Sequence, residues 1–469
     1  MSSTRLLDHV PALEQALHTL RQHHRVPGAS LAIRYHDAGV ELSSGVANVR
    51  TGVSVTPETL FQIGSNTKVY TTSLIMQLVE EGRIELDRSV RTYLPTFRLK
   101  DPEAAAQITV RQLLNHTSGI EGDYFEAFGP GDDSLARYVE SLAQLGQIHG
   151  PGERFSYCNS AFVVAGRLLE VMTGQRYHEV LAERLLRPLG LRATTVLIEE
   201  MIGHRYAVGH YFDESGAARV VGQIMMDRSA APAGSVTSAT ALDVLQFVRM
   251  HLDGGRAPDG SQVLSPSSVA LMQTPSVVRP ASPSGRGQQG LGWRTDEWDG
   301  HRVIGHGGGT NGQLSFLEVL PDDELAVVLL TNAPSGGRLW QDLGAYVFQA
   351  LAGVQMPGPV RPTGEAPRLP LALYAGVYER LSERVEVHHL REGGGDELQA
   401  ALVPTGPLAA AFGEKPERIR LRPLDRERFY YRTRDGDEGL FVFDDFDAEG
   451  RPGTVFSGRL ARRVEEKAG

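Results

Sequence analysis

Lysine is scarce in this chain. Only Lys68, Lys100, Lys415 and Lys467 occur, although lysine and arginine together number 47. Arginine stays protonated in proteins and does not serve as a base, whereas a buried lysine can lose its proton. The composition therefore leaves only four positions for a lysine that accepts a proton.

Cysteine, long apolar runs and excess positive charge are also lacking. The single Cys158 excludes an internal disulfide framework. No apolar run reaches the roughly 18 residues of a membrane-spanning helix, so no membrane partner is expected. A formal net charge of −10 argues against nucleic-acid binding. No His-Glu-x-x-His spacing occurs, and neither a metal nor an organic cofactor is expected.

The first 352 residues predict a mixed α/β (α+β) domain. A helix is expected at about residues 6–24, and its lack of a hydrophobic signal core predicts a cytoplasmic protein. Residues 56–250 are mostly helical in pattern, and a helix at about 337–352 ends the domain. Strand patterns lie on both sides of the helical stretch, which predicts an antiparallel sheet with an inserted helical region. These strands are expected at 29–36, 40–46, 290–294, 301–305, 314–319 and 325–331.

The remainder of the chain differs from the first 352 residues in composition and in its pattern of apolar residues. Residues 353–369 are rich in proline and are expected to form a linker. Residues 370–469 contain short alternating segments separated by turn residues, which predicts a small antiparallel β-barrel domain. The expected strands are 377–379, 384–389, 398–403, 418–422, 429–433, 440–443 and 455–460.

Ser65 and Lys68 form the first candidate constellation. Apolar residues at helical spacing follow Ser65 up to Glu81, and Gly82 is a suitable C-terminal cap. Two side chains three residues apart on a helix lie about 5–6 Å from each other at Cβ. The pair therefore suits a nucleophile and its activator, although a capping serine beside a solvated lysine has the same spacing.

Tyr157 and Asn159 form the second constellation, just before an apolar helix at 161–173. A turn at this point would present both side chains on one side and direct Cys158 inward. A tyrosine beside a protonated lysine can lose its proton well below its usual pKa of about 10. The alternative is a core tyrosine followed by an asparagine that caps the helix.

The third constellation is His306-Gly307-Gly308-Gly309. Glycines on a strand indicate that another backbone or a ligand approaches closely. The N–H of Gly309 could then stabilise an oxyanion together with the N–H of Ser65. A bulge or hairpin turn, with a structural histidine, is the alternative.

Together the three constellations resemble the penicillin-recognising serine enzymes, whose Ser-x-x-Lys motif they share. The second motif points to the branch of class C β-lactamases, D,D-peptidases and family VIII esterases. Residues 113–119, Leu-Leu-Asn-His-Thr-Ser-Gly, are similar to a further segment of that branch. The resemblance covers roughly residues 10–350, and the tail from about 370 resembles a lipocalin-like barrel. It implies a β-lactamase/transpeptidase-like fold.

The resemblance also implies residue roles. Ser65 attacks the acyl carbonyl, and Lys68 with Tyr157 accepts its proton. Asn159 positions Lys68 or a substrate amide, and the N–H groups of Ser65 and Gly309 form the oxyanion hole. Gly307 and Gly308 line the substrate site. Independently of the resemblance, a neutral His306 that hydrogen-bonds Tyr157 would keep the base network intact.

One departure bears on the substrate. His306-Gly307-Gly308 stands where β-lactamases of this branch carry Lys-Thr-Gly, so a fixed positive charge is missing. We therefore expect an acyl-enzyme hydrolase or acyltransferase for ester, amide or thioester groups of a small molecule or peptide, including D-configured peptides. One alternative is a thioesterase that releases or cyclises nonribosomal peptides from a carrier protein. Another is a catalytically silent binding or sensor protein. Residues around 120–135, 200–230 and 275–290 are expected to determine the leaving group.

Overall fold

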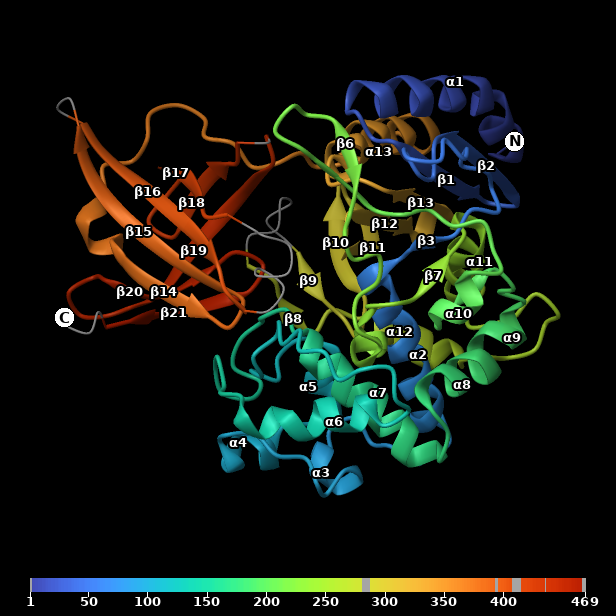
Figure 1. Ribbon diagram of the computed structural model, residues 1–469, viewed down its shortest axis with the longest axis horizontal. Coiled ribbons are helices and arrows are strands. Elements are labelled where there is room, and N and C mark those ends of the chain that lie inside the picture. Colours follow the sequence, from blue (N-terminus) through green and yellow to red (C-terminus); the bar gives the residue numbers. More distant parts are fainter. Residues whose placement is uncertain (1, 281–286, 393–394, 407–414, 435, 466–469) are drawn as a thin grey trace.

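The computed structural model describes residues 2–280, 287–392, 395–406, 415–434 and 436–465 (Figure 1). These residues form a large antiparallel sheet with helices, and a closed antiparallel barrel beside it. The mixed fold class and the terminal barrel predicted by the sequence are thereby confirmed. The limits 1–352, 353–369 and 370–469 for separate domains stay a prediction.

The large sheet is assembled from both ends of residues 2–352. Its order is β2-β1-β13-β12-β11-β10-β9-β8, and all neighbouring strands are antiparallel. Strand β13 lies inside the sheet and is buried along its whole length, as its apolar run at 325–330 leads us to expect. The strands are β1 (Gly28–Tyr35), β2 (Ala38–Gly45), β8 (Val277–Val278), β9 (Gln288–Gln289), β10 (Arg294–Trp298), β11 (His301–Thr310), β12 (Gln313–Leu320) and β13 (Leu325–Thr331).

Two helices lie together against this sheet, α1 (Ser2–His23) and α13 (Gly336–Ala352), as Figure 1 shows. Both carry apolar residues at helical spacing, and Leu13 and Leu17 share one buried cluster with Leu343 and Val347. Among the described helices, none is both long and apolar enough to cross a lipid bilayer.

The helical region is inserted between β2 and β8. Helices α2 and α7 are its centre, because both are buried over most of their length. The helices are α2 (Thr67–Glu80), α3 (Val90–Tyr93), α4 (Pro102–Gln107), α5 (Val110–Leu114), α6 (Ser134–Ser141), α7 (Asn159–Thr173), α8 (Tyr177–Leu181), α9 (Arg187–Leu189), α10 (Ile198–Met201), α11 (Ala241–Leu252) and α12 (Pro266–Gln273). Short strands accompany them, β3 (Phe61–Gln62), β4 (Thr194–Thr195), β5 (His210–Phe212), β6 (Ala218–Val220) and β7 (Ser238–Ala239).

The barrel closes through the pairing of its first and last strands. Its interior is filled by buried aromatic rings, among them Tyr374, Tyr378, Phe429, Phe441 and Phe443. It is therefore a packed core. Its strands are β14 (Gly376–Arg380), β15 (Glu383–Glu392), β16 (Gly395–Pro404), β17 (Glu417–Pro423), β18 (Arg428–Arg432), β19 (Glu438–Phe446), β20 (Pro452–Phe456) and β21 (Leu460–Val464).

Three strand predictions need correction. Residues 290–293 form a turn, because the Gly290 N–H donates to the Trp293 carbonyl at 2.8 Å and Gly292 has φ +73°. The segment 455–460 is two strands joined at Gly458, whose φ is +82°. Strand β11 continues through the glycine run to Thr310, and the hairpin turn follows at Asn311 and Gly312.

Candidate active site

Ser65 lies in a short 3-10 turn, Gly64–Asn66, that leads into α2. Gly64 has φ +50°, and a Cβ there would lie 2.7 Å from the amide nitrogen of Gly309. Only glycine fits this close contact between the turn and β11. The N-cap of α2 is Asn66, so the alternative of a capping Ser65 is wrong.

Lys68 is fully buried one turn after Ser65. Its Nζ lies 2.9 Å from the Ser65 Oγ, and 2.7 Å from both the Asn159 Oδ1 and the Ala233 carbonyl oxygen. A neutral amine has two N–H groups and one lone pair. When the amide and carbonyl oxygens accept both N–H groups, the lone pair faces the Ser65 hydroxyl.

The surroundings of Lys68 favour the neutral amine. Burial, and then the positive charge of Arg459, lower the pKa of Lys68 well below its ordinary value, whereas Asp123 and Cys158 oppose this shift. The shift is in the direction that a general base needs, because only the neutral amine can accept a proton.

Tyr157 lies just before α7, and its ring stacks on that of His116 with centroids 4.2 Å apart. The Lys68 Nζ is 4.9 Å from the centre of the same ring. Burial raises the pKa of Tyr157 above its ordinary value, although a hydrogen bond with Ser65 works in the opposite direction. This shift favours the protonated phenol, whereas the sequence suggested that a protonated lysine beside Tyr157 would promote its ionisation.

The start of α7 is capped by Cys158 rather than by Asn159. The Ala161 N–H donates to the Cys158 Sγ at 3.3 Å, and the Cys158 N–H donates to the His116 Nδ1 at 3.0 Å. Cys158 is directed inward, as expected. The alternative of a capping Asn159 is therefore wrong, and its Nδ2 instead donates to the Asp123 Oδ1 at 2.8 Å.

The glycines of β11 meet the turn that carries Ser65. A Cβ on Gly308 would lie 2.0 Å from the Ile63 carbonyl oxygen, so the close approach indicated by the sequence is that of another backbone. The Nδ1 of His306 donates to the Gly307 carbonyl at 2.6 Å instead of pairing with Tyr157 as expected, although the two ring centroids are only 6.1 Å apart. Burial lowers the pKa of His306 to about 3, which leaves the imidazole neutral.

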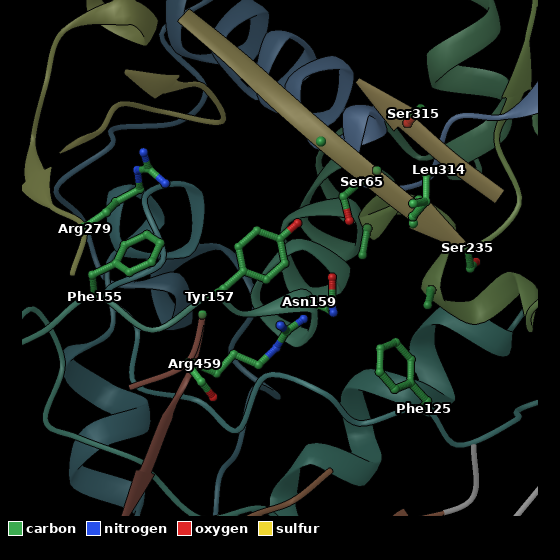
Figure 2. Close-up of a pocket in the computed structure, with 18 of the residues that line it drawn as sticks. Ser65, Phe125, Phe155, Tyr157, Asn159, Ser235, Arg279, Leu314, Ser315 and Arg459 are labelled. Atoms are coloured by element: carbon green, nitrogen blue, oxygen red, sulfur yellow. The ribbon is translucent and has the colours of Figure 1, made fainter. Parts of the chain in front are cut away.

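Ser65, Tyr157 and Asn159 open into a cleft of about 680 Å³ that Gly307, Gly308 and Gly309 also line (Figure 2). A cavity of this size is typical of small-molecule and peptide sites. The three loop regions expected to determine the leaving group all contribute to it, through Phe125, Met226, Arg279 and Pro280. Residues 281–286 of the third region lie outside the described residues.

The barrel supplies one wall of the cleft, which the sequence did not predict. In Figure 2, Tyr157 and Asn159 lie between Ser65 and Arg459 of the barrel. The Arg459 guanidinium is 4.9 Å from the centre of the Tyr157 ring and is paired with Asp123. Six barrel residues line the cleft, Tyr431, Leu440, Phe456, Ser457, Gly458 and Arg459.

The barrel is held at the cleft by polar and apolar contacts. The Leu460 N–H donates to the Ser156 Oγ at 3.2 Å, and the Arg462 Nε donates to the Ile148 carbonyl at 2.6 Å. Ile148 and Phe155 form a buried cluster with Phe456 and Leu460 of the barrel. Neither Arg459 nor Asp123 belongs to a motif, so no local signal in the sequence could have revealed this pair.

Comparison with known proteins agrees with this architecture. The family model described as Beta-lactamase matches residues 13–352. Penicillin-binding protein 4 of Amycolatopsis lactamdurans is 42% identical over 371 residues, which cover 78% of this chain and 97% of that protein.

Two solved structures are similar over much of the chain. SurE superposes with a TM-score of 0.76 and 27% identity over 97% of this chain and 99% of that chain, and SurE has also been solved with D-Leu. A D-stereospecific amidohydrolase from Streptomyces sp. superposes with a TM-score of 0.57 and 28% identity, over 73% of this chain and 98% of that chain. The chain therefore belongs to the beta-lactamase family of serine acyl hydrolases and acyltransferases.

Proposed function

We propose that the protein is a serine acyl-enzyme hydrolase or acyltransferase with Ser65 as nucleophile and Lys68 as general base. The observation that carries the proposal is the position of the Lys68 amine. It lies 2.9 Å from the Ser65 Oγ, and two oxygen acceptors occupy its other directions. A lone pair held toward a hydroxyl at this distance is the geometry of an activated nucleophile.

Acylation follows from these positions. The Ser65 oxygen attacks the substrate carbonyl as its proton passes to Lys68. The N–H groups of Ser65 and Gly309 stabilise the resulting oxyanion, and both residues line the cleft. Tyr157 is protonated in the resting site, so it can donate its proton to the leaving group and regain one from the Lys68 ammonium.

Deacylation uses the same groups in the reverse order. Water or an amine gives up a proton to the Tyr157–Lys68 pair as it attacks the acyl carbonyl, and the Ser65 oxygen leaves and is reprotonated. Asn159 keeps Lys68 in place through the 2.7 Å hydrogen bond from Nζ. The neutral His306 beside Tyr157 adds no competing charge.

The substrate class that fits best is a D-configured peptidyl ester, amide or thioester. Two similar proteins support this choice, because one is named as D-stereospecific and the other has been solved with D-Leu. The Arg459 guanidinium in the cleft also suits a leaving group or acceptor that carries a carboxylate. A β-lactam fits less well, because a neutral His306 followed by Gly307 and Gly308 places no positive charge at these three positions of β11.

Release or cyclisation of a carrier-bound peptidyl thioester is the second candidate. It is compatible with the barrel, which adds a second wall to the cleft beside Ser65. Simple ligand capture by the barrel is disfavoured, because buried aromatic rings occupy its interior.

Mass spectrometry with a phosphonate ester probe tests the nucleophile. We expect one phosphonyl group on the peptide that contains Ser65, and none on the Ser65→Ala variant. An unmodified Ser65, with label elsewhere or nowhere, would contradict the proposal.

A substrate panel tests the specificity. A p-nitrophenyl ester, a D-alanyl amide, a cephalosporin and a D-configured peptidyl thioester are compared on one preparation, each with an L-configured counterpart where one exists. We expect turnover of D-configured acyl groups and slow reaction of the cephalosporin. Preference for the cephalosporin would contradict the assigned substrate class.

A further inference from the structure

Asp123 joins the barrel to the catalytic lysine. One of its oxygens, Oδ1, accepts from the Asn159 Nδ2 at 2.8 Å. The other, Oδ2, pairs with Arg459 and accepts from the Ser382 Oγ at 3.2 Å. Two turns of the barrel, one between β14 and β15 and one between β20 and β21, therefore hold this carboxylate, whose side chain is 9% exposed.

The orientation of the Asn159 amide depends on that carboxylate. An amide presents either an oxygen or an NH₂ group to its neighbour, and the two orientations have nearly the same shape. Lys68 needs the oxygen, because an NH₂ group cannot accept its N–H. A carboxylate accepts only, so Asp123 selects the orientation that directs Oδ1 toward Lys68.

We propose that Asp123 is a positioning residue for the Asn159–Lys68 pair, and that the barrel completes the catalytic site by holding Asp123 through Arg459 and Ser382. The proposal rests on the proposed function, in which Lys68 is the base. It assigns to the barrel a role in the chemical step in addition to its contact with substrate.

The charged groups around Lys68 give the proposal a second consequence that can be measured. Among the described residues, the ionisable groups that face Lys68 are Asp123, Cys158, Tyr157, His116, His306 and Arg459. Burial raises the pKa of Cys158 and Tyr157 and lowers the pKa of His116 and His306, so these four are neutral. Asp123 and Arg459 remain as the charged neighbours, and they act on Lys68 with opposite signs.

The pH dependence of kcat/KM in the full-length protein tests the proposal. The acid limb of the profile reports protonation of Lys68. Asp123→Asn removes a negative charge and should move that limb to lower pH, whereas Arg459→Gln removes a positive charge and should move it to higher pH. Asp123→Asn should also lower kcat by about tenfold to a hundredfold, because the amide of Asn159 is no longer fixed.

Three further variants complete the design. Asp123→Glu retains the charge and should keep the limb near its wild-type position. The double variant Asp123→Asn/Arg459→Gln leaves no unpaired buried charge, so it tests the proposal even if Asp123→Asn does not fold. The acid limb of the double variant should lie near the wild-type position, because the two charge effects on Lys68 cancel. Arg338→Gln removes another ion pair between the barrel and the sheet region, that with Asp437 at 3.3 Å, and should leave the limb in place.

Equal profiles in all folded variants, or shifts of the same sign in Asp123→Asn and Arg459→Gln, would overturn the proposal. A merely structural role of Asp123 would lower the rate without moving the limb. Phosphonate labelling of wild-type Ser65 distinguishes this proposal from the proposed function. An unlabelled Ser65 would contradict the proposed function itself, whereas a labelled Ser65 with unshifted profiles would contradict only the role of Asp123.

Discussion

The Lys68 amine faces three oxygen atoms, but it can donate to all three only as an ammonium. Its burial opposes that charged form, and the neutral form must leave one oxygen without an N–H. The Ser65 hydroxyl is the one neighbour of the three that can donate instead of accepting. In the proposed mechanism, desolvation and hydrogen-bond geometry together therefore favour proton transfer from the Ser65 hydroxyl to the Lys68 amine.

Removal of either member of the base network should lower turnover strongly. We expect Lys68→Ala and Tyr157→Phe each to reduce kcat/KM for a p-nitrophenyl ester by about 10²-fold or more, the usual loss with a general acid or base. Lys100→Ala is the matched lysine control, because Lys100 is exposed. Near-normal rates in the first two variants would place the base elsewhere.

The rate should rise with pH through the pKa of Lys68, because the neutral amine is the active form. Burial lowers that pKa, so the rise should come well below the pH of about 10.4 at which free lysine titrates. Steady-state kcat/KM against pH measures it. His306→Asn should show the same acid limb, since the His306 pKa of about 3 lies far from neutrality. Loss of the limb in that variant would assign it to the histidine.

At the scale of elements, the active site depends on backbone contacts that glycine permits. Gly308 and Gly64 bring β11 and the Ser65 turn into direct contact, at distances that a Cβ would prevent. The strand can thus direct its N–H groups into the cleft without intervening side chains. Sequence patterns predicted a strand at 301–305 and a helix start at Ser65, but only the structure identifies which glycines are sterically required.

Gly308→Ala should destabilise the protein, whereas Gly307→Ala should not. The new methyl group at 308 would lie 2.0 Å from the Ile63 carbonyl oxygen, but at 307 its nearest contact is the Ser315 carbonyl oxygen at 3.8 Å. Thermal or urea unfolding should show a loss of about 1–3 kcal/mol for the first variant, the usual cost of overpacking. Equal stabilities would contradict the contact.

Helices with apolar residues at regular spacing, and strands with an unbroken apolar run, were predicted well from the sequence. The expected strand at 325–331 coincides with β13, and the helix at 337–352 differs from α13 by one residue. Two of the three strand errors fell at glycines with positive φ, Gly292 and Gly458, which interrupt an extended segment without changing its polarity pattern. Local pattern does not encode these dihedral angles.

At the scale of the whole molecule, the active site is shared between distant parts of the chain. The motifs located Ser65, Lys68, Tyr157 and Asn159, because short-range spacing places each pair on one turn or helix start. Asp123 and Arg459 were not predicted, because their proximity depends on how the barrel packs against the sheet region. Such packing is a long-range property that a single sequence does not reveal.

The interface ring Phe456 should link barrel position to activity. Phe456→Ala removes a side chain that packs on Phe155, with ring centroids 6.1 Å apart, beside the turn that carries Arg459. We expect a loss of stability on the order of 3 kcal/mol and a fall in kcat/KM of about tenfold, measured by thermal unfolding and ester hydrolysis. Phe446→Ala, a half-buried barrel ring contacted by Arg426, is the control for activity.

The turn Ser457–Gly458–Arg459 has a consequence for how this enzyme can evolve. It is three residues long, its bend depends on the φ of +82° at Gly458, and strands of a packed barrel hold both its ends. Ser457 lines the cleft without contacting Asp123 or Lys68, so mutations at this position can alter substrate preference while Arg459 keeps its place beside Asp123. A saturation library at Ser457, with Gly458, Arg459 and Ser382 retained, is thus a compact route to new acyl acceptors.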